Sequence, residues 1–253
     1  MEKRVSLTEP AAMPQYKRPP ITEAVIEIRF EQPLPRPEVD KLQQRFRSEY
    51  AFSEDFVAYE VRVNPAARSA DFEEQSSGYK LSSADRADVL LVTSAHVTCS
   101  RLAPYVGWDR FRARAEDHWR TWKRVTGYRK ISRIGVRFIN RIDIPAAGGE
   151  EVKISDYLRV HPEAPAVKRM VSYAMQMAGP LEEDDCRFVI NSSLVPPPLV
   201  DHASVILDID VSRAGDPPQK DDEIWALIDR IRVHKNQVFE ESVTDKAREL
   251  FNA

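Results

Sequence analysis

The chain has 253 residues, of which 42% are hydrophobic and 30% are charged, and its formal net charge is −3. This composition is typical of a globular protein with one large or two small cores. No apolar run approaches the ~20 residues that a membrane span requires, and the N-terminus has no apolar signal segment. Cys99 and Cys186 form no CxxC motif, which argues against a zinc ribbon or a disulfide framework. We therefore expect a cytoplasmic protein, with no membrane contact and no bulk affinity for nucleic acid.

The first half of the chain has the pattern of a strand, a helix, four strands and a helix. Residues 1–18 lack apolar periodicity and are expected to form a flexible arm. Residues 21–30 alternate between apolar and polar side chains, and 36–50 have helical spacing. Further strands are expected near 56–64, 78–83, 88–93 and 95–102. A helix over 107–126 carries an aromatic stripe, and Gly127 stands where a C-cap glycine belongs.

The second half repeats this order. A strand over 131–144 is followed by a short helical stretch near 154–160 and by a long helix that opens at Asp221. Three strands are expected in between, near 168–178, 186–195 and 203–212. The repeated order predicts an α+β fold of two pseudo-repeated halves, 19–128 and 129–253, in which helices cover one face of a curved antiparallel sheet. Such an arrangement is similar to TATA-binding-protein-like or helix-grip folds.

The strand over 131–144 places three arginines, Arg133, Arg137 and Arg141, opposite its apolar face. If the apolar strand faces meet the helices, polar side chains from several strands share the open face. This candidate polar surface comprises Glu23, Glu27, Arg29, Arg133, Arg137, Arg141, Asp208 and Asp210. Two interpretations remain open. The surface is either a lattice of cross-strand ion pairs or a basin that binds an anionic ligand through its guanidinium groups. Of the three, Arg141 is expected to be the most available for binding.

Motifs of known chemistry are scarce. The sequence contains no GxxxxGK[ST] or GxGxxG phosphate loop, no GxSxG elbow and no HExxH pair, and its five histidines lack metal-ligand spacing. Triphosphate tunnel enzymes open with a Glu-x-Glu-x-Lys strand, which Glu27 and Arg29 partly match, but Val25 stands where the first carboxylate belongs. We therefore predict no catalytic residue, cofactor or metal ligand.

Positive charge is concentrated between Arg101 and Arg141, where twelve Lys or Arg stand against three Asp or Glu. On the helix over 107–126, six basic side chains lie off the aromatic stripe and are expected to be exposed. This candidate basic surface comprises Arg110, Arg112, Arg114, Arg120, Lys123 and Arg124. It would offer phosphate contacts without base readout, or simply pair with acidic residues of the chain itself.

Three stretches of the sequence carry a resemblance: YKRPPITEAVIEIRF, ISRIGVRFINRIDIP and HKNQVFEESVTDKARELF. They are similar to signature stretches of a sporadically distributed family of bacterial proteins of about this length that has no assigned function. Sporadic distribution implies horizontal transfer, as for toxin–antitoxin and phage-defence genes. We expect a non-enzymatic binding protein that acts through a protein partner, with a homodimer left open. The alternative is a ligand-binding or phosphoryl-transfer enzyme that uses the polar surface.

Overall fold

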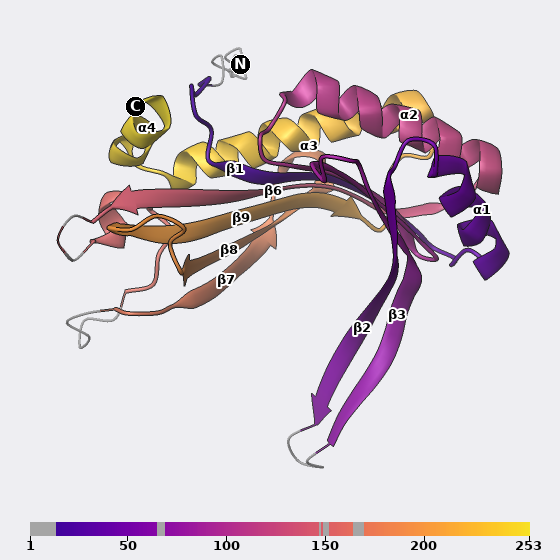
Figure 1. Cartoon of the computed structure of the whole chain (residues 1–253), viewed down its shortest axis with the longest axis horizontal. Coiled ribbons are helices and arrows are strands. Elements are labelled where there is room, and N and C mark those ends of the chain that lie inside the picture. Colours follow the sequence, from indigo (N-terminus) through magenta and orange to yellow (C-terminus); the bar gives the residue numbers. More distant parts are fainter. Residues whose placement is uncertain (1–13, 65–68, 147, 149–151, 164–169) are drawn as a thin grey trace, which may run out of the picture.

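In a computed structural model of the chain, the described residues form a nine-stranded antiparallel sheet with helices on one face (Figure 1). The structure describes residues 14–64, 69–146, 148, 152–163 and 170–253. The strands are β1 (Ile21–Phe30), β2 (Phe52–Asn64), β3 (Ser69–Ser82), β4 (Asp88–Thr93), β5 (His96–Leu102), β6 (Ile131–Pro145), β7 (Ala174–Pro180), β8 (Arg187–Val195) and β9 (His202–Ala214). Their order in the sheet is β2-β3-β4-β5-β1-β6-β9-β8-β7. The α+β class and the antiparallel sheet expected from the sequence are confirmed.

Among these described residues, four α-helices accompany the sheet: α1 (Arg36–Phe46), α2 (Trp108–Thr126), α3 (Asp221–Ser242) and α4 (Asp245–Asn252). Figure 1 shows them on the same side of the sheet. The predicted end of α2 is confirmed, because Gly127 has a positive φ of 70° and its N–H donates to the carbonyl of Lys123 at 2.9 Å. Helix α4 was not predicted. Its N-cap is Thr244, whose hydroxyl accepts from the N–H of Ala247.

The alternation in β1 explains why its apolar face meets the helices. Ala24, Ile26, Ile28 and Phe30 are all buried, while the side chains between them face away. The aromatic stripe of α2 packs on this face, with the ring of Trp122 stacked on Phe30 at a centroid distance of 4.2 Å. The core therefore lies between the helices and the sheet, and the opposite face of the central strands carries mostly polar residues.

Helix α3 is fixed to α2 by polar contacts as well as by packing. The indole N–H of Trp108 donates to Asp229 at 2.8 Å, and that of Trp119 donates to Asp221 at 2.9 Å. Both acceptors project from α3 toward the aromatic stripe of α2. The two long helices thus form one layer over the centre of the sheet (Figure 1).

The β2–β3 hairpin extends beyond the rest of the sheet (Figure 1). Strand β3 pairs with β2 along its whole length, but with β4 only over Gly78–Ser82. At Gly78 a side chain is excluded, since an added Cβ would lie 2.1 Å from the carbonyl oxygen of Val92. Strand β3 was predicted only from residue 78, because its first part is mostly polar and the alternation of Ala70 and Phe72 with polar residues is not continued.

Part of the predicted N-terminal arm contacts the helices. Residues 1–13 lie outside the described residues, but Tyr16 packs edge-on against Phe251 of α4, with ring centroids 5.1 Å apart. Its hydroxyl donates to Glu240 of α3. Tyr16, inside the predicted arm 1–18, thus packs on the helices through contacts too distant in sequence to be seen as periodicity, and the flexibility of the arm stays a prediction.

Candidate binding surface

The central strands present a polar surface on the face without helices. Register places Glu27 of β1 opposite Gly135 of β6, and Arg137 of β6 lies between Val25 of β1 and Asp210 of β9. Ion pairs join these three strands. We use the name polar lattice for Glu27, Arg29, Arg133, Arg137, Asp208 and Asp210.

Arg133 is the junction of the polar lattice. Its Nη1 donates to Oε1 of Glu27 at 2.5 Å, and its Nη2 donates to Oδ2 of Asp210, also at 2.5 Å. The guanidinium reaches both because it lies over Gly135, where an added Cβ would be 2.6 Å from Nη1. One arginine thus bonds carboxylates from the strands on either side of its own.

Arg137 and Asp208 form the second unit of the polar lattice. The Nε and Nη2 atoms of Arg137 each donate to one carboxylate oxygen of Asp208 at 2.7 Å, which is the bidentate geometry of a strong pair. Asn191 of β8 donates to the same carboxylate at 3.0 Å, and Gln176 of β7 donates to Asn191 at 2.7 Å. Polar contacts therefore continue to the edge strand β7.

Arg29 completes the polar lattice on β1. Its Nε and Nη2 donate to the two oxygens of Glu27 at 2.6 and 3.2 Å. Burial opposes ionisation of Glu27, but the hydrogen bond and charge of Arg29 and the charge of Arg133 prevail and lower its pKa. For Asp210 the balance is reversed, and burial raises its pKa despite the charge of Arg133. The hydrogen bond to Asp208 raises the pKa of Arg137.

Two residues of the predicted polar surface stand apart from the lattice. Arg141 bonds Asp143 of its own strand, with Nε 3.1 Å from Oδ1, rather than Asp208 or Asp210. Among the described contacts, Glu23 forms no ion pair with Arg133 or Arg137. Arg141 was expected to be the most available guanidinium, but Arg29 and Arg137 are more exposed.

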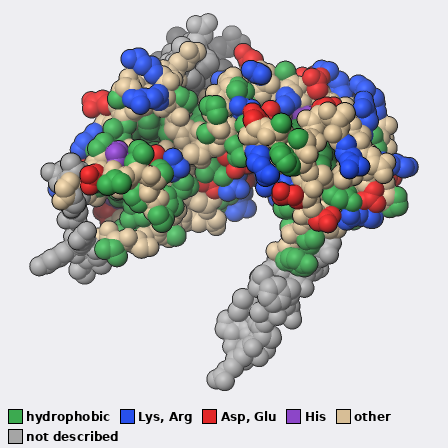
Figure 2. Space-filling model, in the orientation of Figure 1, with side chains coloured by type: hydrophobic (Ala, Val, Ile, Leu, Met, Phe, Trp, Pro, Cys, Tyr) green, Lys and Arg blue, Asp and Glu red, His purple; other side chains and the backbone are tan. Residues whose placement is uncertain are grey.

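The candidate basic surface on α2 is largely neutralised by nearby acidic residues. Arg112 bonds Asp229 of α3 at 3.1 Å, and Arg120 bonds Asp117 at 2.6 Å. Lys123 pairs with Asp221 of α3. Figure 2 shows red and blue side chains interspersed over α1 and α2 rather than one continuous basic patch.

The prediction of exposure is wrong for Arg114, which is half-buried and lies against the sheet. It pairs with Asp88 of β4 and donates to the carbonyl of Ser100 at 2.7 Å. Only Arg110 and Arg124 are exposed and take part in none of the ion pairs of the described residues. Two separated arginines are a weak basis for phosphate binding.

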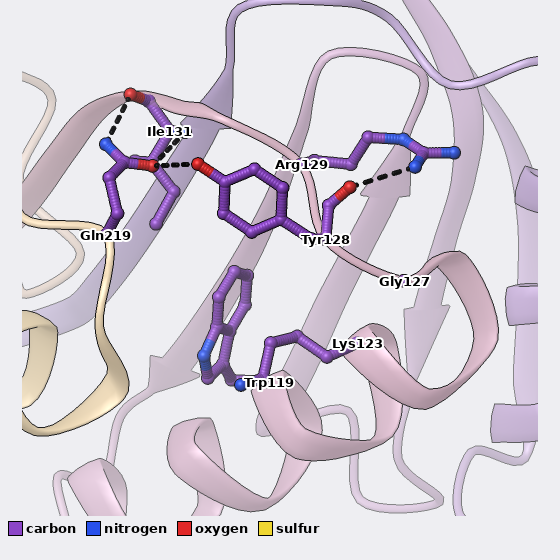
Figure 3. A pocket seen from close by; sticks show the side chains of 7 residues that line it. All are labelled: Trp119, Lys123, Gly127, Tyr128, Arg129, Ile131 and Gln219. Atoms are coloured by element: carbon purple, nitrogen blue, oxygen red, sulfur yellow. Dashed lines mark hydrogen bonds between the residues drawn. The ribbon is translucent and has the colours of Figure 1, made fainter.

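A pocket of about 280 Å³ opens on the helix side, where α2 ends and β6 begins (Figure 3). It is lined by Trp119, Lys123, Gly127, Tyr128, Arg129, Ile131 and Gln219. The side-chain oxygen of Gln219 accepts from the N–H of Ile131 at 2.9 Å, and its nitrogen donates to the carbonyl of Ile131 at 3.1 Å. Lys123 and Arg129 are paired with carboxylates of α3 and α1. The polar groups of the pocket are therefore engaged with the protein itself.

A thiol and an imidazole meet in the core, which the sequence did not reveal. Sγ of Cys99 on β5 lies 3.5 Å from Nδ1 of His118 on α2, and Nε2 of His118 lies 3.3 Å from the hydroxyl of Tyr50. Burial raises the pKa of Cys99 to about 12 and lowers the pKa of His118 to about 4. Near neutral pH both groups are uncharged, which is the opposite of a reactive thiolate–imidazolium pair.

We predict that neither cysteine of the native protein reacts with Ellman's reagent within minutes, because Cys99 and Cys186 are both buried. Two thiols should appear after unfolding in guanidinium chloride, as the sequence contains two cysteines. Rapid labelling of Cys99 in the folded protein would show that the thiol is accessible and would reopen the question of thiol chemistry.

Within the described part of the chain, no group of three His, Cys, Asp or Glu side chains is arranged to hold a metal ion. The helices of that part are also too short or too polar to cross a membrane. Comparisons with known proteins found no matching family model and no matching curated protein. The resemblance of the three sequence stretches to a bacterial family therefore remains an expectation.

Proposed function

We propose that this chain is a non-enzymatic binding protein that recognises a protein partner across the helix-free face of its sheet. The observation that carries the proposal is the polar lattice. Its guanidinium groups are held by carboxylates of neighbouring strands, so they form a preorganised surface rather than an empty anion site. A role in a toxin–antitoxin or phage-defence pair follows from the family resemblance alone.

The fold supports this use of the sheet. We propose that the halves 19–128 and 129–253 are pseudo-repeats in the manner of TATA-binding-protein-like folds, which bind partners on the sheet face opposite the helices. In favour of this, β1 and β6 are neighbours at the centre of the sheet, and β5 and β9 flank them on either side. At the base of the β2–β3 hairpin, Phe52 adds an exposed apolar side chain at one end of the sheet.

The alternative of a phosphoryl-transfer enzyme has less support. Arg133 and Arg137 donate to buried or half-buried carboxylates, so a phosphate would have to displace Asp208 or Asp210 from charge-assisted bonds. A transferred phosphoryl group also concentrates close to two negative charges at one point, whereas the polar lattice has no excess of positive charge, with three arginines and three carboxylates.

Site-specific photo-cross-linking in the native host tests the proposal. We expect a photoreactive side chain at Phe52 or Ala178, both toward the edges of the helix-free face, to cross-link to one specific protein. Matched positions on the helix side, Lys41 and Arg124, are exposed controls and should give no product. Mass spectrometry identifies the partner. Cross-links only from the helix positions would show that the partner binds the opposite face.

A further inference from the structure

Two ion pairs of the polar lattice are asymmetric in exposure. The side chain of Asp208 is 6% exposed, whereas that of its partner Arg137 is 46% exposed. Glu27 is 16% exposed, and its partner Arg29 is 51% exposed. The two carboxylates therefore lie beneath their arginines, and the outer edges of the two guanidinium groups are exposed to solvent.

Both exposed guanidiniums keep donors for a partner. Arg29 and Arg137 each use Nε and Nη2 to hold their own carboxylate. Within the described part of the chain, Nη1 of neither arginine donates to a protein acceptor. Because the planar group is fixed on one edge, a carboxylate that approaches the other edge meets oriented N–H groups at a small cost in side-chain entropy.

The strand register sets the spacing of the two groups. Arg137 pairs with Val25, which is four residues before Arg29 on β1. At about 3.4 Å per residue along the strand and about 4.8 Å between strands, the two Cα atoms lie ~14 Å apart. The Cα atoms of two residues four positions apart on an extended segment have a similar separation.

We propose that the partner contacts this face with an acidic segment whose carboxylates bind the outer edges of Arg29 and Arg137. This inference rests on the proposed function and adds the chemistry of the partner. An acidic protein segment fits better than nucleic acid, because the duplex carries a charge every ~1.7 Å and requires a continuous basic surface. Here two separate guanidiniums stand among the carboxylates of Glu27, Asp208 and Asp210.

Fluorescence anisotropy with labelled peptides tests the inference on the full chain. The probe is an extended Thr/Ser-rich peptide with glutamates at positions i and i+4, and its control carries glutamines there. We expect the glutamate peptide to bind at least about tenfold more tightly than the glutamine peptide, and its affinity to fall with added salt. Equal affinities for the two peptides would overturn the inference.

Three variants locate the binding. Arg29→Gln and Arg137→Lys should each weaken binding of the glutamate peptide by about tenfold or more. Arg137→Lys keeps a positive charge beside Asp208 and so protects the fold, but it lacks the second guanidinium edge. Arg110→Gln, on the helix side, is the matched control and should bind as the parent does. Unchanged affinity in both Arg29→Gln and Arg137→Lys would overturn the inference.

Nucleic acid and the proposed function are tested separately. Tighter binding of a single-stranded oligothymidine than of the glutamate peptide, lost in Arg29→Gln, would replace the acidic segment with a phosphate backbone. Cross-links from Phe52 and Ala178 without glutamate-peptide binding would retain a partner on this face and reject its acidic chemistry. Cross-links from the helix side alone would reject the proposed function itself.

Discussion

Replacing Lys235 by methionine is expected to raise the free energy of unfolding by roughly 3 kcal/mol at pH 6. Lys235 lies on α3 and is only 4% exposed, with its Nζ 3.7 Å from the centroid of the Phe138 ring. Burial, with a further contribution from the charge of Arg232, lowers its pKa to about 7. The cation–π contact with Phe138 offsets only part of the cost of burying the charge. Methionine fills a similar volume without that cost.

The sign of the pH dependence follows from the lowered pKa. Between the folded pKa of about 7 and the unfolded value of 10.5, the unfolded chain binds more protons at this lysine than the folded chain does. Stability contributed by the site therefore rises with pH, by at most about 1.4 kcal/mol per pH unit. The advantage of Lys235→Met should shrink accordingly as the pH rises from 6 to 10.

Urea unfolding of the parent and Lys235→Met at several pH values measures this effect. The exposed Lys41 on α1 supplies the control, and Lys41→Met should leave the stability and its pH slope almost unchanged. If Lys235→Met retained the pH slope of the parent between pH 7 and 10, the buried amine would not be its source.

The elements that the sequence predicted correctly are those whose pattern is local. The strand over 131–144 and the helix over 107–126 have strict periodicity, and both are present as β6 and α2. The first part of β3 is different, because residues 69–77 are mostly polar and pair in the sheet with β2 alone. Helix α4 is short and follows α3 after two residues, so its pattern merges with that of the longer helix.

The predicted polar surface shows the same difference between what local periodicity predicts and what depends on contacts between distant residues. Periodicity correctly placed Glu27, Arg133 and Asp210 on one face, because side chains alternate along each strand. Which carboxylate each arginine bonds depends on register. Arg141 has Asp143 two residues away, whereas Arg112 and Lys123 of α2 bond acids of α3 about a hundred residues later in the chain. Such partners cannot be read from composition.

The sequence shows that position 135 is a glycine, but it does not show that the space over this glycine is used by another side chain. The position interrupts the row of arginines on β6, which in the sequence is only a gap in the pattern. In the structure the gap is occupied by the guanidinium of Arg133. A side chain at this position would therefore oblige the guanidinium of Arg133 to move away from its place between β1 and β9.

This geometry predicts strong coupling between Arg133 and Gly135. Arg133→Ala should lower the free energy of unfolding by roughly 2–3 kcal/mol, because Asp210 and Glu27 are largely buried and lose a charged donor. Gly135→Ala alone should cost roughly 2 kcal/mol, since the added Cβ displaces the guanidinium from both carboxylates.

In the Arg133→Ala background the second substitution meets no guanidinium. Gly135→Ala should then be neutral or slightly stabilising, because alanine costs less backbone entropy than glycine in a strand. Denaturant unfolding of the four proteins gives the coupling energy, expected at roughly 2 kcal/mol. Arg141→Ala, which removes a half-exposed pair within one strand, should cost less than about 1 kcal/mol. Additive effects of Arg133→Ala and Gly135→Ala would mean that the guanidinium does not depend on the space above Gly135, and the polar lattice would then have no single junction.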